Sequence, residues 1–140
     1  KAKVAVIGSG MTGIETAELL ANQGNEVTVF EMADAIGPGL YFQNLLDIMA
    51  HLKAHDVGFY AGHRLVEIDG RRAVFEQRET GESKTFEFDR YVLSLGNRST
   101  AAPMEHLTGT FDRVFLLGDA VKPGRIRNAL ETGYQTAFQL

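Results

Sequence analysis

Three glycines and one acidic residue near the start of the chain have the spacing of a nucleotide-binding turn. Gly8, Gly10 and Gly13 follow an apolar stretch, and Glu31 follows a second one. Glycines so spaced permit a tight strand-to-helix turn, close approach of phosphate to the backbone, and close packing of helix on strand. The helix that begins here directs unpaired N–H groups and the positive end of its dipole at an anion. The pattern therefore predicts a pyrophosphate site.

Glu31 indicates which nucleotide this turn would hold. It lies close to the spacing, about 20 residues, at which an acidic side chain meets the ribose hydroxyls of a dinucleotide. A carboxylate accepts hydrogen bonds from an adenosine ribose and repels a 2′-phosphate, and residues 32–35 contain no Arg or Lys. NADH is therefore favoured over NADPH. The alternative is a glycine turn in an α/β domain that holds no ligand.

The elements that must position these residues alternate between apolar strands and amphipathic helices. Buried strands are apolar on both faces, whereas strands with one solvated face alternate. We predict parallel strands over 3–8, 26–31, 57–60, 89–96 and 114–117, helices over 12–22, 41–55 and 126–139, a three-stranded meander over 64–68, 73–77 and 85–88, and an irregular stretch over 97–112. The predicted fold class is α/β, a Rossmann-type three-layer sandwich with parallel sheet order 3-2-1-4-5 and an antiparallel β-meander crossover.

Composition excludes several other classes of protein. The chain has 140 residues, a net charge of -4 and no cysteine. Without cysteine it cannot form disulfides, a redox cysteine pair or a cysteine-ligated iron–sulfur cluster. The absence of a basic cluster argues against a nucleic-acid surface. No apolar run reaches the roughly 18 residues that a membrane helix needs, so we expect a cytoplasmic protein with neither a membrane nor a nucleic-acid partner.

The segment from Val4 to Glu15, VAVIGSGMTGIE, resembles the NAD(P)H-binding domain of the two-dinucleotide-binding-domain flavoproteins, the pyridine nucleotide–disulfide oxidoreductase superfamily. The segments LSLGNR at 93–98 and VFLLGDA at 114–120 support this resemblance. The segment GDAVKPGRI at 118–126 is similar to a narrower group. These are the multidomain NADH:flavin oxidoreductases of the old-yellow-enzyme, 2,4-dienoyl-CoA reductase and trimethylamine dehydrogenase type.

The resemblance implies a single dinucleotide-binding domain, 1–140, excised from a longer flavoenzyme. Residues 1–109 would be the nicotinamide-nucleotide-binding unit, and residues 110–140 the returning strand and helix of a FAD-type domain. In such proteins FAD, FMN and an iron–sulfur cluster lie in the parent chain, whose remaining FAD and barrel domains would be the partners. The domain would position the nicotinamide of NADH for hydride transfer to a flavin bound elsewhere, and the isolated chain would be inactive.

The resemblance also assigns roles to individual residues. It places Glu15 on the nicotinamide side of the site, and Gly96 would line the crevice at the carboxyl ends of the strands. In the family Asp119 contacts the ribityl chain of a flavin, but this chain has only one fingerprint, so the local alternative is an acid that caps the final helix. The predicted cofactor-binding set is Gly8, Gly10, Met11, Thr12, Gly13, Ile14, Glu15, Glu31, Met32, Gly96 and Asp119. We predict no catalytic residue and no metal ligand.

Two other functional classes share part of this pattern. A non-catalytic NAD(H)-sensing regulatory module would carry the same glycine turn without a flavin partner, although it would not need Gly118 and Asp119. An S-adenosylmethionine-dependent methyltransferase also combines a glycine turn with an acid after the second strand. The third glycine, Gly13, and the meander count against the methyltransferase.

Overall fold

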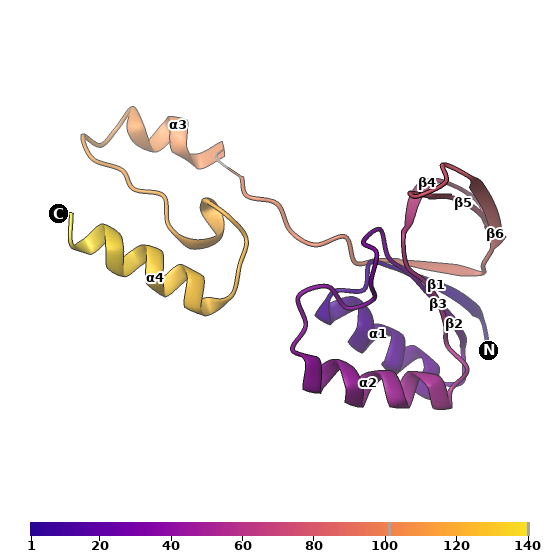
Figure 1. The fold of residues 1–140 in the computed structure, drawn as a ribbon. Coiled ribbons are helices and arrows are strands. Elements are labelled where there is room, and N and C mark those ends of the chain that lie inside the picture. The colour runs from indigo at the N-terminus through magenta and orange to yellow at the C-terminus, as the bar shows by residue number, and fades with distance from the viewer. Residues whose placement is uncertain (101, 140) are drawn as a thin grey trace. The chain divides into compact units, whose positions relative to one another are not determined.

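The computed structural model describes residues 1–100 and 102–139 and divides the chain into two compact units. The first unit comprises residues 1–96, and the second begins at Asn97. The first contains both β-sheets, whereas the described part of the second is built from helices and connecting segments (Figure 1). The assignment of 1–109 and 110–140 to a nicotinamide-binding unit and a FAD-type domain stays a prediction.

A parallel sheet of four strands organises the first unit. Its order is β3-β2-β1-β7, and each neighbouring pair is parallel. Its strands are β1 (Lys3–Ile7), β2 (Glu26–Phe30), β3 (Gly58–Tyr60) and β7 (Arg90–Leu93), and helices α1 (Met11–Asn22) and α2 (Phe42–Ala54) connect the first three. The predicted order is therefore confirmed over its first four strands.

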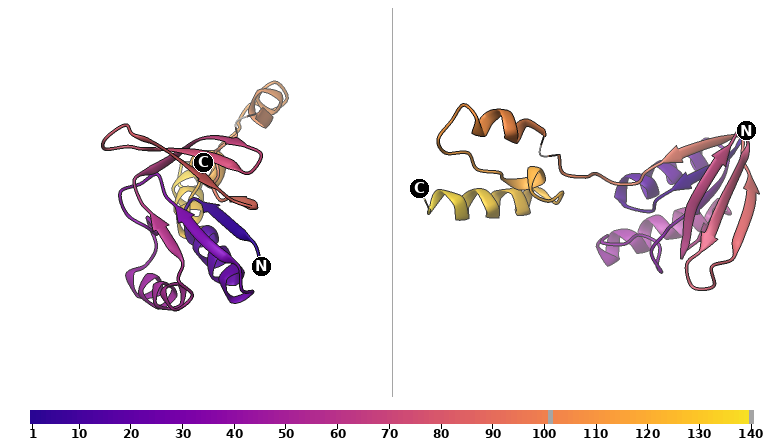
Figure 2. Two further views of the ribbon diagram at one scale, coloured as in Figure 1. Left: turned by 90° about the vertical axis from the view of Figure 1, so that its right-hand side faces the viewer. Right: turned by 90° about the horizontal axis from the view of Figure 1, so that it is seen from above.

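A three-stranded antiparallel sheet forms the crossover between β3 and β7, as predicted. It consists of β4 (His63–Asp69), β5 (Arg72–Gln77) and β6 (Ser83–Glu87), in that order. Figures 1 and 2 show α1 and α2 on one face of the parallel sheet and this meander on the other. The first unit is thus a three-layer sandwich of helices, parallel sheet and antiparallel sheet.

Two apolar cores explain why the central strands are apolar on both faces. Neighbouring residues of a strand point to opposite faces. Val29 accordingly packs with the helices, and Phe30 packs with the meander. Phe30 stacks on Phe75 with ring centroids 3.8 Å apart, and Phe86 meets its edge at 5.0 Å. Since both faces are covered, the sequence of β2 shows no polar alternation.

The second unit departs from prediction in two places. It contains α3 (Ala102–Thr108), the short 3₁₀ helix η1 (Gly118–Ala120) and α4 (Ile126–Ala137). The predicted irregular stretch 97–112 is wrong where α3 forms. Pro103 does not prevent this helix, because it lies in the first turn, where proline removes no helical hydrogen bond. The predicted strand over 114–117 is also wrong. No strand in the described part of this unit is available to pair with it, and an apolar run without a partner forms no ladder.

Neither a membrane span nor a metal cluster is found among the described residues. No helix there is long and apolar enough to cross a membrane, and no group of three or more metal-binding side chains comes together there. His51 on α2 instead pairs with Glu18 on α1, with its Nδ1 2.7 Å from the carboxylate. This contact links the two helices.

Candidate functional site

The glycine turn between β1 and α1 is closed tightly at two of its three glycines. Gly8 has φ +99°, and a Cβ there would overlap the carbonyl of Ser94, which follows β7. A Cβ on Gly13 would overlap the carbonyl oxygen of Gly8 and lie 3.2 Å from the Ser94 Cβ. Glycine at these two positions therefore lets β1, α1 and the end of β7 approach one another closely.

Gly10 differs from the other two because it faces open space. Its φ of -61° is accessible to any residue, and a Cβ built there would meet nothing within 4 Å. Gly10 is the N-cap of α1, no side chain caps this helix, and no acid lies in its first turn. The first helical hydrogen bond runs from Ile14 N–H to the Gly10 carbonyl, at 3.0 Å. The preceding N–H groups, those of residues 11–13, can therefore bind an anion.

Glu31 lies immediately after β2, and its carboxylate is held in one orientation. Its side chain is 8% exposed. The Ser9 N–H and hydroxyl donate to Oε2 at 2.8 and 2.7 Å, and the Ala33 N–H donates to Oε1 at 2.8 Å. Burial alone would raise the pKa of Glu31, but the hydrogen bonds from Ala33 and Ser9 outweigh it and lower the pKa below its usual value. The glycine turn is thereby linked to an ionised acid.

Ser9 is a member of this site that the sequence did not single out. It is fully buried between Gly8 and Gly10. Its hydroxyl donates to Glu31 and accepts a hydrogen bond from the Gly37 N–H at 2.9 Å. Ser9 thus joins the glycine turn, the end of β2 and the loop before α2. A polar residue between two glycines of the fingerprint is the sequence feature that could have indicated this role.

Four of the other predicted residues lie around the turn with different exposure. Met11, Thr12 and Glu15 are all exposed, the first two at the start of α1 and Glu15 in its second turn. Ile14 differs, because its side chain is fully buried in the core between the helices and the sheet. Its N–H already bonds to Gly10, so Ile14 supports the turn from beneath.

Gly96 and Met32 lie beyond the carboxyl ends of strands on the two sides of β1. Gly96 follows β7, which is tied to β1 by a hydrogen bond from Ser94 N–H to the Ile7 carbonyl at 2.8 Å. It has φ +79° and open space at its Cβ position. Met32 follows Glu31, and its side chain is 55% exposed. Both residues therefore lie at the sheet edge where the glycine turn lies.

Asp119 belongs to the second unit, whereas the other predicted residues belong to the first. Its Oδ1 accepts a hydrogen bond from the Gly124 N–H at 3.1 Å. The next residue, Arg125, is the N-cap of α4, and the Asn128 side chain accepts from its N–H at 2.9 Å. Asp119 thus holds the loop that leads into α4, and Asn128 makes the cap contact.

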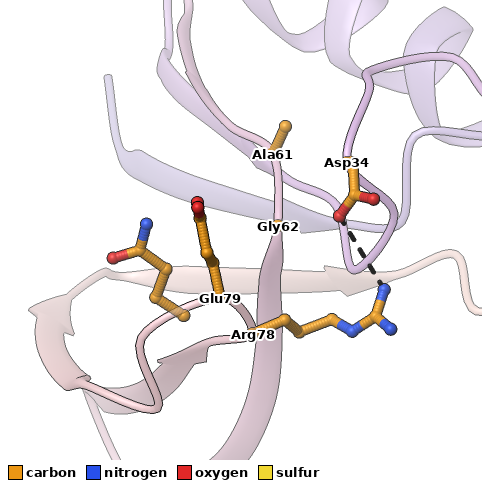
Figure 3. Close-up of a pocket in the computed structure, with 6 residues that line it drawn as sticks. Asp34, Ala61, Gly62, Arg78 and Glu79 are labelled. Carbon is orange, nitrogen blue, oxygen red and sulfur yellow. Dashed lines mark ion pairs between the residues drawn. The ribbon is translucent and has the colours of Figure 1, made fainter.

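Arg78 is a second residue that the sequence did not indicate. It lies in the turn after β5, and its Nη1 donates to the Met32 carbonyl at 3.2 Å and lies 3.9 Å from Asp34 Oδ1. It lines a cavity of about 510 Å³ together with Asp34, Ala61, Gly62, Gln77 and Glu79 (Figure 3). Residues 32–35 contain no Arg or Lys, but Arg78 brings a positive charge to this segment from the meander. No local pattern links Arg78 to a residue 46 positions away.

The sheet order, the glycine turn at the helix N-terminus and the acid after β2 define a Rossmann-like dinucleotide-binding fold. The family described as pyridine nucleotide-disulphide oxidoreductase matches residues 1–133, and the chain belongs to this family. The predicted membership of the superfamily is therefore confirmed.

Individual relatives are much longer than this chain. It is 29% identical over 139 residues to an NADH oxidase of Thermoanaerobacter brockii, covering 99% of this chain and 21% of that protein. It is 26% identical over 165 residues to a metal reductase of Desulforamulus reducens, covering 97% and 24%. A solved complex of 2-naphthoyl-CoA reductase superposes with a TM-score of 0.77 at 25% identity, covering 99% of this chain and 21% of that chain. The chain thus spans about a quarter or less of these relatives.

Proposed function

We propose that this chain binds NADH and positions its nicotinamide for hydride transfer to a flavin held elsewhere in the protein that contains it. The open position at Gly10 is the observation that carries the proposal. At Gly8 and Gly13, neighbouring backbone atoms leave no room for a side chain, whereas the space at Gly10, in front of the helix N-terminus, is open. That is where a pyrophosphate would need to approach the backbone.

Different residues of the chain would bind different parts of the coenzyme. The N–H groups of residues 11–13 would bind the pyrophosphate, and Glu31 would accept hydrogen bonds from the adenosine ribose. Ser9 and Ala33 donate three hydrogen bonds to this carboxylate, and the Met32 N–H also lowers its pKa, so a ribose hydroxyl would meet an ionised acceptor held in one orientation. Gly96 and Glu15 would border the nicotinamide.

The coenzyme itself supplies the hydride chemistry, and the protein supplies position and electrostatics. No side chain is proposed as a general acid, base or nucleophile. The name of the Thermoanaerobacter relative, an NADH oxidase, supports NADH as the ligand. The narrower likeness to multidomain NADH:flavin oxidoreductases, with FAD, FMN and an iron–sulfur cluster in neighbouring domains, belongs to this proposal too.

Substitution of Gly10 tests the proposed function directly. Gly10→Val should leave the fold intact, because φ is ordinary and the space is open, yet its side chain would occupy the pyrophosphate position. We expect calorimetric titration to show at least a ten-fold weaker Kd for NADH, about 1.4 kcal/mol. Gly133→Ala is the matched control, since Gly133 also has open space at its Cβ, and it should bind as wild type does.

Retained NADH affinity in Gly10→Val would overturn the site. Binding of S-adenosylmethionine in place of NADH would favour a methyltransferase. NADH binding without reduction of any flavin in the longer protein would favour a sensing module. Each outcome thus separates one alternative from the proposal.

A further inference from the structure

The cavity beside Arg78 is connected to Glu31 by the backbone. The Ala33 N–H donates to the Glu31 carboxylate, and the Ala33 carbonyl accepts from the Gly62 N–H at 2.8 Å. The Gly62 carbonyl in turn accepts from the Arg78 N–H at 2.8 Å. Three hydrogen bonds therefore link the proposed ribose-binding acid to the residue whose guanidinium borders the cavity.

The size of this cavity suits the adenosine end of a dinucleotide. Its volume of about 510 Å³ lies within the range of small-molecule pockets. A Cβ on Gly62 would meet nothing within 4 Å, so this part of the wall is bare backbone. A ribose held at Glu31 would carry its 2′ position toward the segment 32–34, which Arg78 contacts.

The charges at the cavity are arranged so that the cation is partly neutralised. Figure 3 shows the Asp34 carboxylate directed at the Arg78 guanidinium, with Glu79 on the neighbouring wall. Arg78 also donates to the Met32 carbonyl. Among these lining residues the acids outnumber the single base, so a 2′-phosphate meets net negative charge.

We propose that Asp34 and Arg78 form a charge pair that adds to the preference of Glu31 for NADH over NADPH at this site. Asp34 holds the guanidinium of Arg78 against the Met32 carbonyl and keeps it from binding a 2′-phosphate, so the 2′-hydroxyl of NADH is preferred. Without Asp34, Arg78 becomes a ligand for the 2′-phosphate of NADPH, to which a guanidinium can make two parallel hydrogen bonds. This inference rests on the proposed binding of a nicotinamide dinucleotide.

A double-mutant cycle on the 140-residue chain tests the pair. The quantity measured is the ratio of the Kd for NADPH to the Kd for NADH, by calorimetric titration of wild type, Asp34→Asn, Arg78→Gln and the double variant. Asp34→Asn should lower this ratio at least five-fold. The double variant should return it to the value of Arg78→Gln, because the released guanidinium is then absent.

The Arg64–Glu76 pair provides a matched control in the same meander. Arg64 is 50% exposed and Arg78 51%, and each pairs with an acid. Glu76→Gln removes the same charge as Asp34→Asn but frees an arginine that does not line the cavity, so it should leave the ratio within two-fold of wild type. Asp34 is 95% exposed, and equal thermal midpoints by circular dichroism will show that the variants fold.

The results separate this inference from the proposed function. A wild-type chain that binds neither coenzyme overturns both. If the chain binds NADH but Asp34→Asn shifts the ratio of the two Kd values no more than Glu76→Gln does, the charge pair alone is overturned. An equal shift of the ratio in the presence and absence of Arg78 also overturns it, because the effect would then be that of charge at a distance.

Discussion

The two compact units of the chain differ in where their apolar side chains lie. In the first, helices and meander cover both faces of the parallel sheet, and every buried apolar side chain among the described residues lies between Val4 and Phe88. In the second, α4 and the residue after it present an apolar stripe at every fourth position. Its members, Ile126, Leu130, Tyr134 and Phe138, are 81, 69, 69 and 76% exposed.

This difference indicates which unit buries enough apolar surface to fold without help from other segments. Most helical stability in proteins comes from burying an apolar face, and an exposed apolar stripe marks a surface that another element covers. The first unit satisfies this requirement internally. The second unit does not bury its stripe within itself, so we expect its helices to be less stable on their own than those of the first unit.

Producing the two units as separate segments should give the largest difference in stability between them. We expect the segment 1–96 to unfold cooperatively in urea and to bind NADH, because it contains all the predicted site residues except Asp119. The segment 97–140 should show little helix by circular dichroism at 25 °C, because isolated helices of 12 residues are marginal in water. A cooperative thermal transition in the segment 97–140 would contradict the comparison.

The same substitution in each unit would give the next largest effect. Leu52 on α2 is fully buried, whereas Leu130 on α4 is 69% exposed. Leu52→Ala should lower the free energy of unfolding by about 2–5 kcal/mol, and Leu130→Ala should change it by less than about 0.5 kcal/mol. Urea midpoints of the 140-residue chain measure both. Equal losses for the two variants would show that the stripe on α4 is buried in solution.

The response to acid should give the smallest effect and should arise in the first unit. The pKa of Glu31 is lower in the folded than in the unfolded chain, so its ionised form stabilises the fold above the unfolded pKa. That contribution is lost as the pH falls through the folded pKa. Wild type should therefore lose more stability than Glu31→Gln between pH 6 and acid conditions, as measured by urea unfolding at each pH.

Ser9→Ala sharpens this measurement. It removes the hydroxyl donor to Glu31 but keeps the Ser9 backbone donor. Its pH dependence should fall between those of wild type and Glu31→Gln, at a cost of about 1 kcal/mol at neutral pH. The segment 1–96 should reproduce the difference. An identical acid response in all three proteins would contradict the role of these hydrogen bonds.

The fold of the first unit was predictable because its determinants are local in the sequence. Glycines, apolar runs and hairpin turns each fix a short segment, and chain order then restricts the topology. The close approach of Ser94 to Gly8 was not predictable, because the predicted strand order places β7 beside β1 but does not give the path of the backbone after β7 ends. The role of Arg78 was hidden for the same reason, since the meander brings it to Met32 across 46 positions.

The error at 114–117 has a different physical origin. This run, VFLL, has the composition of a buried strand, yet Phe115, Leu116 and Leu117 are between 37 and 43% exposed. A strand requires hydrogen-bonding partners on its edges as well as apolar side chains. The apolar pattern of a run describes its side chains, but it does not tell whether another strand lies beside the run to accept its backbone hydrogen bonds.

The placement of β7 beside β1 has a consequence for the order of events during synthesis. β1 pairs with β2 on one side, but its partner on the other side, β7, emerges roughly sixty residues later. At about 5–20 residues per second, one edge of the central strand stays open for several seconds, and an open edge is a template for wrong pairing. Ser94 arrives with β7. The glycine turn therefore acquires its final walls late, only after the nascent chain has passed this strand.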